Sequence, residues 1–234
     1  IEKICKARII RLKQASSYIK NLSRAFHEEI TDDDIQLSHD ENIKNLINNY
    51  DKFEKPAKLV ELLKMVHDLT NNNKKIIIWS THLMTIDLIL KELKDQKINV
   101  KKIVGKTELD DRENIKNEFN DPNSLLQVIV ALPQACSESI SLHKACHNAI
   151  YYDINYNAAE FLQSLDRIHR VGGSEKNSVQ YDFLHYQDTV DIKVYERVFQ
   201  KANRQMQIIE EDNLTFDLDD EEQNWEELYK DLNL

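Results

Sequence analysis

Two arginines and a glutamine carry the most distinctive chemistry of this 234-residue chain. Arg167 and Arg170 are three residues apart, and Gln163 lies four residues before Arg167. At 3.6 residues per helical turn, this spacing places all three on one face of a helix, together with Asp166. Two guanidinium groups on one face suit an anion with several oxygens, such as a transferring phosphoryl group. An R-x-x-R pair can equally be a pair of ordinary surface charges that bind acids of their own helix, Asp166 or Glu160.

The residues around this group predict a short amphipathic helix over 158–170. Its apolar residues gather on the side opposite the arginines: Phe161, Leu162, Leu165 and Ile168. Asn157 is a suitable N-cap, and Glu160 follows three residues later as its capping-box partner. Gly172-Gly173 supplies a C-terminal stop. The sequence therefore predicts both ends of the helix that carries the arginines.

From residue 74 onward, the hydrophobic pattern alternates between strand and helix. The expected strands cover residues 76–79, 100–104, 125–131, 149–152 and 179–184. The expected helices cover residues 56–69, 83–94, 110–119, 158–170 and 189–208, and a further short helix after Ser139 is possible. The continuous apolar run over 76–79 is typical of a strand buried on both faces. Repeated strand–helix units predict an α/β fold with a parallel sheet and helices on both faces.

The rest of the chain is predicted to form two appendages to this domain. Helical spacing of apolar residues predicts a helix over 1–30, with an acidic break at 31–34 and a possible second helix before Tyr50. We therefore expect a helical extension at 1–54, the α/β domain at 55–208 and an acidic tail at 209–234. From Glu210 onward there are eleven acids and one lysine. Their charges sum to −10, which is the net charge of the whole chain. The tail is expected to be disordered beyond about residue 212, and the balanced remainder can still present a basic face.

Composition restricts the cellular environment and the cofactors. No stretch is apolar enough to span a membrane and no signal peptide opens the chain, so no membrane partner is expected. The three cysteines are odd in number and do not have framework spacing, which favours the reducing cytoplasm. Two of them fall near two histidines and could be interpreted as a metal cluster: Cys136, His143, Cys146 and His147. That spacing matches no standard zinc pattern, and we predict no metal site.

Several motifs together resemble one protein family. The run Q-S-L-D-R-I-H-R-V-G over 163–172 resembles motif VI of superfamily-two helicases in its Swi/Snf form, Q-x-x-D-R-x-H-R-x-G. Residues 143–153 resemble the strand before that helix, and residues 155–159 resemble the family's W-N-P-type turn. Residues 8–16 resemble its L-x-R-L-R-Q helix. The chain is thus similar to the C-terminal RecA-like lobe of a Swi/Snf-type DNA translocase, and its motifs resemble those of bacterial members of the family.

This resemblance implies roles for the polar face of the 158–170 helix. Arg167 and Arg170 would be arginine fingers that reach the γ-phosphate of ATP bound on a partner lobe. Gln163 would lie near the same phosphate or the attacking water. Asp166 would lie beside the nucleotide and orient the helix. As fingers, both guanidinium groups are expected to be solvent-accessible at the open edge of the lobe.

The resemblance also implies nucleic-acid contacts directly after the strands. Ser80, Thr81 and His82 occupy the motif IV position, near nucleic-acid phosphates, although Ser80 or Thr81 could instead cap the next helix. Lys106 and Thr107 occupy the family's G-S-T turn. They do not form a P-loop, because that pattern needs a glycine where Val100 stands.

The motif V position departs most from the family pattern. Residues 136–142 lack both glycines of that loop, so its backbone is not expected to approach nucleotide and DNA as closely as in relatives. Ser137 and Ser139 are expected to contact nucleic acid, and Glu138 the nucleotide.

Two elements of an ATPase are absent from the sequence. There is no Walker A motif, and the acidic runs Asp32–Asp34 and Asp219–Glu222 lie in polar surroundings instead of following an apolar strand. We expect a fragment of a longer ATPase, monomeric and inactive alone. ATP and Mg²⁺ would be bound mainly by an N-terminal RecA-like lobe, and the partner would be double-stranded DNA. The alternative is a lone RecA-like lobe acting as a non-catalytic module that binds protein or nucleic acid; the retained Gln163, Arg167 and Arg170 favour the motor lobe.

Overall fold

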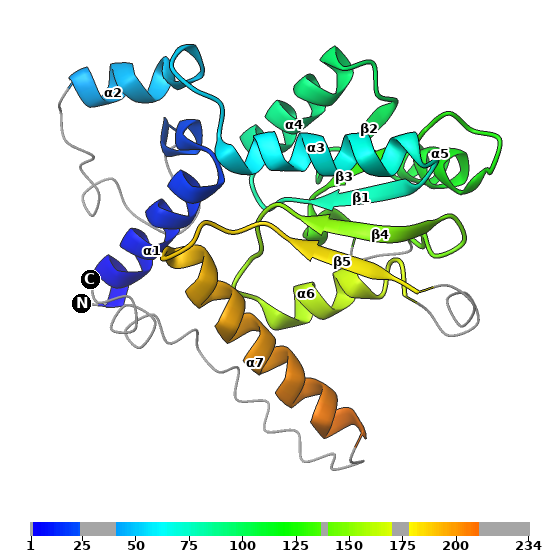
Figure 1. Ribbon diagram of the computed structural model, residues 1–234. Coiled ribbons are helices and arrows are strands. Elements are labelled where there is room, and N and C mark those ends of the chain that lie inside the picture. Colours follow the sequence, from blue (N-terminus) through cyan, green and yellow to red (C-terminus); the bar gives the residue numbers. More distant parts are fainter. Residues whose placement is uncertain (1, 24–40, 137–139, 170–177, 211–234) are drawn as a thin grey trace. The chain divides into compact units, whose positions relative to one another are not determined.

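The computed structural model describes residues 2–23, 41–136, 140–169 and 178–210 (Figure 1). Several sequence predictions lie outside these residues: the acidic break at 31–34, the contacts Ser137, Glu138 and Ser139, the finger Arg170, the Gly172-Gly173 stop and the tail beyond residue 210. The chain divides into two compact units. One is Pro56–His185, and the other combines residues 1–55 with residues 186–234.

The unit Pro56–His185 is built on a five-stranded parallel sheet with the order β2-β3-β1-β4-β5. The strands are β1 (Lys75–Trp79), β2 (Val100–Ile103), β3 (Val128–Ala131), β4 (Cys146–Tyr151) and β5 (Gln180–Phe183). The central strand β1 places Ile77 opposite Ile129 of β3 on one side and opposite Ala149 of β4 on the other. The three inner strands are buried almost throughout, which explains their nearly uninterrupted aliphatic sequences.

Helices cover both faces of this sheet, as the strand–helix pattern predicts (Figure 1). They are α3 (Ala57–Asn71), α4 (Leu83–Asp95), α5 (Leu109–Asn120) and α6 (Ala158–Leu165). Leu62 of α3 and Ile89 of α4 belong to one buried cluster with Ile78 of β1. On the opposite face, the Tyr151 ring stacks on Phe183 at 4.7 Å between centroids and contacts Phe161 of α6 at 5.5 Å. Alternation along β1 and β4 thus sends Ile78 and Ile150 to one layer and Tyr151 to the other.

The main differences from the sequence prediction concern the ends of elements. β3 begins at Val128 instead of residue 125, and α6 ends at Leu165 instead of residue 170. The helix considered after Ser139 is wrong for the described residues 140–145, which contain a turn. Both Ala145 and Cys146 donate their backbone N–H to the carbonyl of Leu142, which leads the chain straight into β4. A short 3₁₀ helix, η3 (Pro133–Cys136), lies before this segment.

The other unit is helical. It contains α1 (Glu2–Ser17), η1 (Ile19–Ser23), α2 (Glu41–Asn48), η2 (Tyr50–Lys52) and α7 (Val190–Glu210). Ser16 Oγ donates to Asp191 Oδ1 at 2.7 Å, which joins α1 to α7. Tyr18 Oη donates to Asp51 Oδ1 at 2.5 Å, which joins the segment after α1 to η2. Helix α7 is thus grouped with the N-terminal helices, whereas the sequence analysis assigned residues 189–208 to the α/β domain. Among the described residues, no helix has the length and apolar character needed to cross a membrane.

Candidate functional site

The order of the strands locates a crevice at the carboxyl ends of β1 and β4. After β1 the chain continues to β2 at one edge of the sheet, and after β4 it continues to β5 at the opposite edge. Such a reversal between neighbouring parallel strands is where open α/β sheets bind ligands. The segments that follow the strands contain the predicted contacts Ser80–His82 after β1 and Lys106-Thr107 after β2. These contacts therefore share one edge of the sheet with the residues that precede α6.

Asp153 joins the ends of β1 and β4. Its Oδ2 accepts a hydrogen bond from Ser80 Oγ at 2.8 Å, and its Oδ1 accepts from Thr81 N at 2.6 Å and Thr81 Oγ1 at 2.5 Å. Asp153 is buried and Ser80 is fully buried. The expectation that the Ser80 hydroxyl faces a nucleic-acid phosphate is therefore wrong for this conformation, because an internal carboxylate binds it. Nor do Ser80 and Thr81 cap α4; its N-cap is His82, without a side-chain hydrogen bond.

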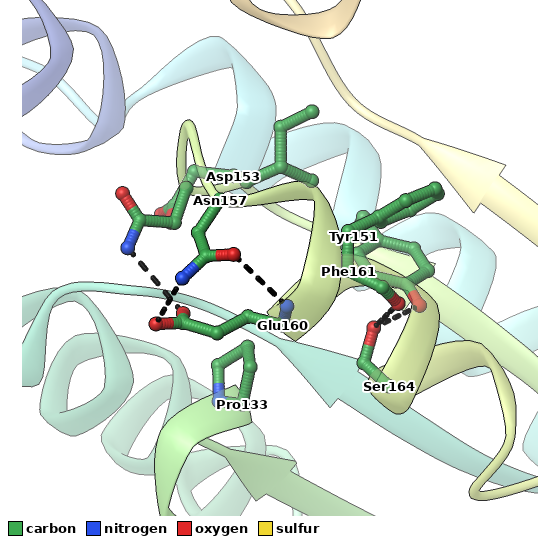
Figure 2. A pocket seen from close by; sticks show the side chains of 9 residues that line it. Pro133, Tyr151, Asp153, Asn157, Glu160, Phe161 and Ser164 are labelled. Carbon is green, nitrogen blue, oxygen red and sulfur yellow. Dashed lines mark hydrogen bonds between the residues drawn. The ribbon is translucent and has the colours of Figure 1, made fainter. Parts of the chain in front are cut away.

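The start of α6 forms one wall of a pocket at this edge (Figure 2). Asn157 Oδ1 accepts hydrogen bonds from Ala159 N at 3.0 Å and Glu160 N at 3.2 Å, which confirms the predicted N-cap. Glu160 in turn accepts from the Asn157 side-chain amide at 3.2 Å and from Gln134 Nε2 at 3.0 Å. Figure 2 shows the Glu160 carboxylate between Asn157 and Pro133, both of which line the pocket. The first turn of α6 is thus closed by its own side chains and offers few free donors to a ligand.

The floor of the pocket contains a buried pair of hydroxyl groups. Tyr151 Oη and Ser164 Oγ are 2.7 Å apart, and Ser164 also donates to the carbonyl of Phe161 at 2.6 Å. Burial raises the pKa of the Tyr151 phenol, while the hydrogen bond to Ser164 acts in the opposite direction. Tyr151 therefore stays protonated at neutral pH and serves to position α6 on the sheet rather than as a general base.

The turn after α6 holds Arg167 inside the fold. The Arg167 side chain donates from Nε to the carbonyl of Gln163 at 2.9 Å and from Nη1 to the carbonyl of Ile140 at 3.3 Å. Its own carbonyl accepts from Leu142 N at 2.8 Å. Only 7% of Arg167 is exposed, so the expectation of a solvent-accessible guanidinium is wrong for this residue. Gln163 and Asp166 are exposed as expected, and Arg170 lies beyond the described segment.

The turn after β2 is closed by side chains from both of its ends. Thr107 Oγ1 accepts a hydrogen bond from Val104 N at 3.0 Å, and the Lys106 side chain is exposed. Arg112 of α5 donates to the carbonyls of Thr107 at 2.8 Å, Gly105 at 3.1 Å and Val104 at 3.4 Å. It also donates to the carbonyl of Ala135 in η3 at 2.8 Å. The turn therefore holds a defined shape beside η3.

The two cysteines of the α/β unit are buried thiols. Burial raises the pKa of Cys136 and of Cys146 to about 12. Among the residues that the structure describes, no group of three His, Cys, Asp or Glu side chains is arranged to hold a metal ion. The thiols therefore contribute to the core as neutral groups.

Comparison with known proteins identifies the family. Residues 54–172, just over half of the chain, match the helicase conserved C-terminal domain. The chain belongs to this family. It is 28% identical over 162 residues to an uncharacterised ATP-dependent helicase of Mycoplasma genitalium. This match covers 69% of the present chain and 15% of that protein. It is 26% identical over 170 residues to the ATP-dependent helicase fft3 of Schizosaccharomyces pombe. This match covers 68% of the present chain and 18% of fft3. The chain thus spans less than a fifth of the length of these relatives.

A solved structure agrees with this assignment. The crystal structure of the C-terminal part of the Fun30 ATPase domain has a TM-score of 0.61 and 20% identity, covering 83% of this chain and 72% of that one. The α/β unit therefore shares the RecA-like fold of that lobe, and the family match agrees with the C-terminal helicase lobe that the motif VI resemblance predicted. Two residues that position the site of this helicase lobe were missed from the sequence. Asp153 had a usable signal, since it directly follows a strand, whereas Arg112 resembles any charged residue of a surface helix.

Proposed function

We propose that this helicase lobe is the second motor lobe of an ATP-dependent double-stranded DNA translocase. It would complete the ATPase site of an N-terminal RecA-like lobe, which would bind most of the ATP and the Mg²⁺. The observation that carries the proposal is the end of α6, where Gln163 in the helix and Asp166 in the turn after it are both exposed, a few residues before Arg170 in the sequence. The start of α6 is closed by Asn157, so the opposite end of the helix is the one available to a nucleotide.

Arg167 and Arg170 have different roles in this proposal. Arg170 is the finger that stabilises negative charge on the transferring γ-phosphoryl group. Arg167 holds the turn that presents it, because its guanidinium already binds the carbonyls of Gln163 and Ile140. Gln163 lies near the phosphate or the attacking water, and Asp166 and Glu138 lie beside the nucleotide.

Double-stranded DNA would bind along the carboxyl edge of the sheet. The proposed contacts are Thr81, His82, Lys106 and Thr107, with Ser137 and Ser139. The first turn of α4 supports a phosphate there, since it has no side-chain cap and no acidic residue. Such contacts bind the DNA backbone and do not select a sequence, which suits a motor that moves along DNA. Ser80 is excluded from this surface because it is fully buried.

ATP turnover by the intact protein with duplex DNA tests the proposal. Replacing Arg170 by Ala should lower DNA-stimulated turnover by about 10³-fold, with DNA affinity unchanged, because the arginine acts in the transition state. Arg170→Lys should recover little, since lysine lacks the planar fork. Arg204→Ala, at an exposed arginine of α7, is the matched control and should keep full turnover.

Two outcomes would contradict this function. Near-normal turnover of Arg170→Ala would remove the finger role. Turnover by the 234-residue chain alone would show that the phosphate-binding elements are not needed from another lobe. If the intact protein binds duplex DNA but no variant and no condition yields turnover, the chain acts as a non-catalytic binding module.

A further inference from the structure

Arg112 uses its whole guanidinium group to bind backbone carbonyls. The four acceptors are the carbonyls of Val104, Gly105, Thr107 and Ala135. The two shortest bonds, both 2.8 Å, go to Thr107 on one side and Ala135 on the other. One side chain therefore joins the turn after β2 to the 3₁₀ helix after β3.

Only arginine has the shape for this set of contacts. Its planar fork directs donors in several fixed directions, whereas a lysine ammonium is a point charge that cannot reach carbonyls on both sides. Thr107 Oγ1 adds a bond inside the same turn by accepting from Val104 N. The shape of residues 104–107 thus depends on one arginine of α5 and one hydroxyl.

The turn that Arg112 holds contains the exposed Lys106. Among the described residues, Lys106 has no ion-pair partner, whereas the nearby lysines of β2 are paired: Lys101 binds Glu118 and Lys102 binds Asp87. The Lys106 ammonium is therefore available to an external anion, and its position relative to η3 is fixed through Arg112. A backbone that fixes the spacing of phosphate contacts lowers the ordering cost of binding.

The other end of α5 is anchored in a similar way. Asn120, at the end of α5, donates to the carbonyl of Ser141 at 3.0 Å, and Arg167 donates to the carbonyl of Ile140. Helix α5 therefore contacts the β3–β4 connection at two places, through Arg112 near its start and Asn120 at its end. Arg112 belongs to a frame of side chains and is not an isolated surface charge.

We propose that Arg112 is a positioning residue for phosphate binding: it holds the 104–107 turn against η3 so that Lys106 meets the backbone of duplex DNA at a fixed place. This inference rests on the proposed function, since it takes duplex DNA as the ligand of the carboxyl edge. Arg112 itself need not touch DNA, because its donors are occupied by carbonyls.

The test measures duplex-DNA affinity of the intact protein over a range of salt concentrations. Lys106→Ala should lower the slope of log affinity against log salt by about 1, as loss of one phosphate contact does. Arg112→Lys keeps the charge but loses the fork, and it should lower the slope by a similar amount. The double variant should be no weaker than either single variant, because both remove the same contact. Lys116→Gln removes a charge from α5 away from the turn and should leave the slope unchanged.

A second variant separates positioning from folding. Thr107→Val removes the hydroxyl that closes the turn and keeps every charge, so it should weaken DNA binding in the same direction without a loss of thermal stability comparable to that of a core substitution. Wild-type affinity and slope in both Arg112→Lys and Thr107→Val would overturn the inference, as would additive losses with Lys106→Ala. Failure of the wild-type protein to bind duplex DNA would overturn the proposed function as well, and this outcome is distinct from the others.

Discussion

Helices α4 and α6 follow the neighbouring strands β1 and β4, but their first turns are built in opposite ways. The first turn of α6 is capped by Asn157, which accepts two backbone N–H groups, and it carries Glu160. The first turn of α4 begins at His82 with no side-chain cap and no acid. A helix start with free N–H groups and a positive dipole end attracts anions, whereas a capped start with a carboxylate does not. The two starts therefore differ in their suitability for an anion, and this difference fits the proposal in which phosphate lies at the beginning of α4 and at the end of α6.

The end of α6 reinforces this contrast. After Leu165 the chain tightens into a turn in which Arg167 N donates to the carbonyl of Ser164 and Ile168 N donates to that of Leu165. The Arg167 side chain then anchors this turn to residue 140. The end of α6 is therefore fixed by interactions with the rest of the lobe, whereas the start of α4 is held mainly by its strand and by Asp153.

Among the variants that test this comparison, Arg167→Ala is expected to lower the free energy of unfolding most. The variant loses two hydrogen bonds from a charged donor and leaves the Ile140 carbonyl without its partner. The free energy of unfolding should therefore fall by about 2–3 kcal/mol. Urea unfolding of the chain in a Trp225→Phe background, followed by the emission of buried Trp79, measures this loss. Gln163→Ala, one turn away and exposed, should stay within about 0.5 kcal/mol of the wild type.

A different result at Arg167 would change the division of roles. If Arg167→Ala unfolds like the wild type but abolishes DNA-stimulated ATP turnover in the intact protein, its guanidinium must leave the carbonyls and act on the nucleotide. If stability and turnover are both lost while Arg167→Lys restores only stability, the fork itself positions the turn.

The fold was largely predictable because its determinants are local. The Ile-Ile-Ile-Trp run of β1, the Pro56 helix start and the Asn157 cap each act through residues close in sequence. The length of α6 was overestimated because a helical wheel does not include the Leu142 N–H, which binds the Arg167 carbonyl from outside the helix.

The site was less predictable because its positioning contacts are distant in sequence. Asp153 binds Ser80 across 73 residues and Arg112 binds Ala135 across 23. Residue type and spacing predicted that the polar groups directly follow the strands, at the carboxyl edge of the sheet. They could not show that two of these groups, Ser80 and Arg167, already have partners inside the lobe.

A smaller effect is expected at the capped helix. Asn157→Ala removes the acceptor of two backbone N–H groups and should lower the free energy of unfolding by about 1 kcal/mol. Asn157→Asp keeps the acceptor and should be nearly neutral. Because this helix start is not a proposed phosphate site, DNA affinity should be unchanged in both variants. Weaker DNA binding by Asn157→Ala at wild-type stability would instead place the start of α6 on the DNA surface.

The smallest change in stability, and the most direct test of the comparison, is expected from giving α4 the cap that α6 has. His82→Asp supplies an acceptor and a negative charge at the N-cap and should stabilise the chain by about 0.5 kcal/mol. The same substitution should weaken duplex-DNA binding by the intact protein and lower its salt slope by about 1, because the carboxylate takes the place of a phosphate. His82→Asn supplies the acceptor without the charge and should give an intermediate loss of affinity, whereas His82→Ala leaves the N-cap without a side-chain acceptor. If His82→Asp binds DNA as the wild type does, the open start of α4 is only an unfilled cap, and the contrast with α6 has no functional content.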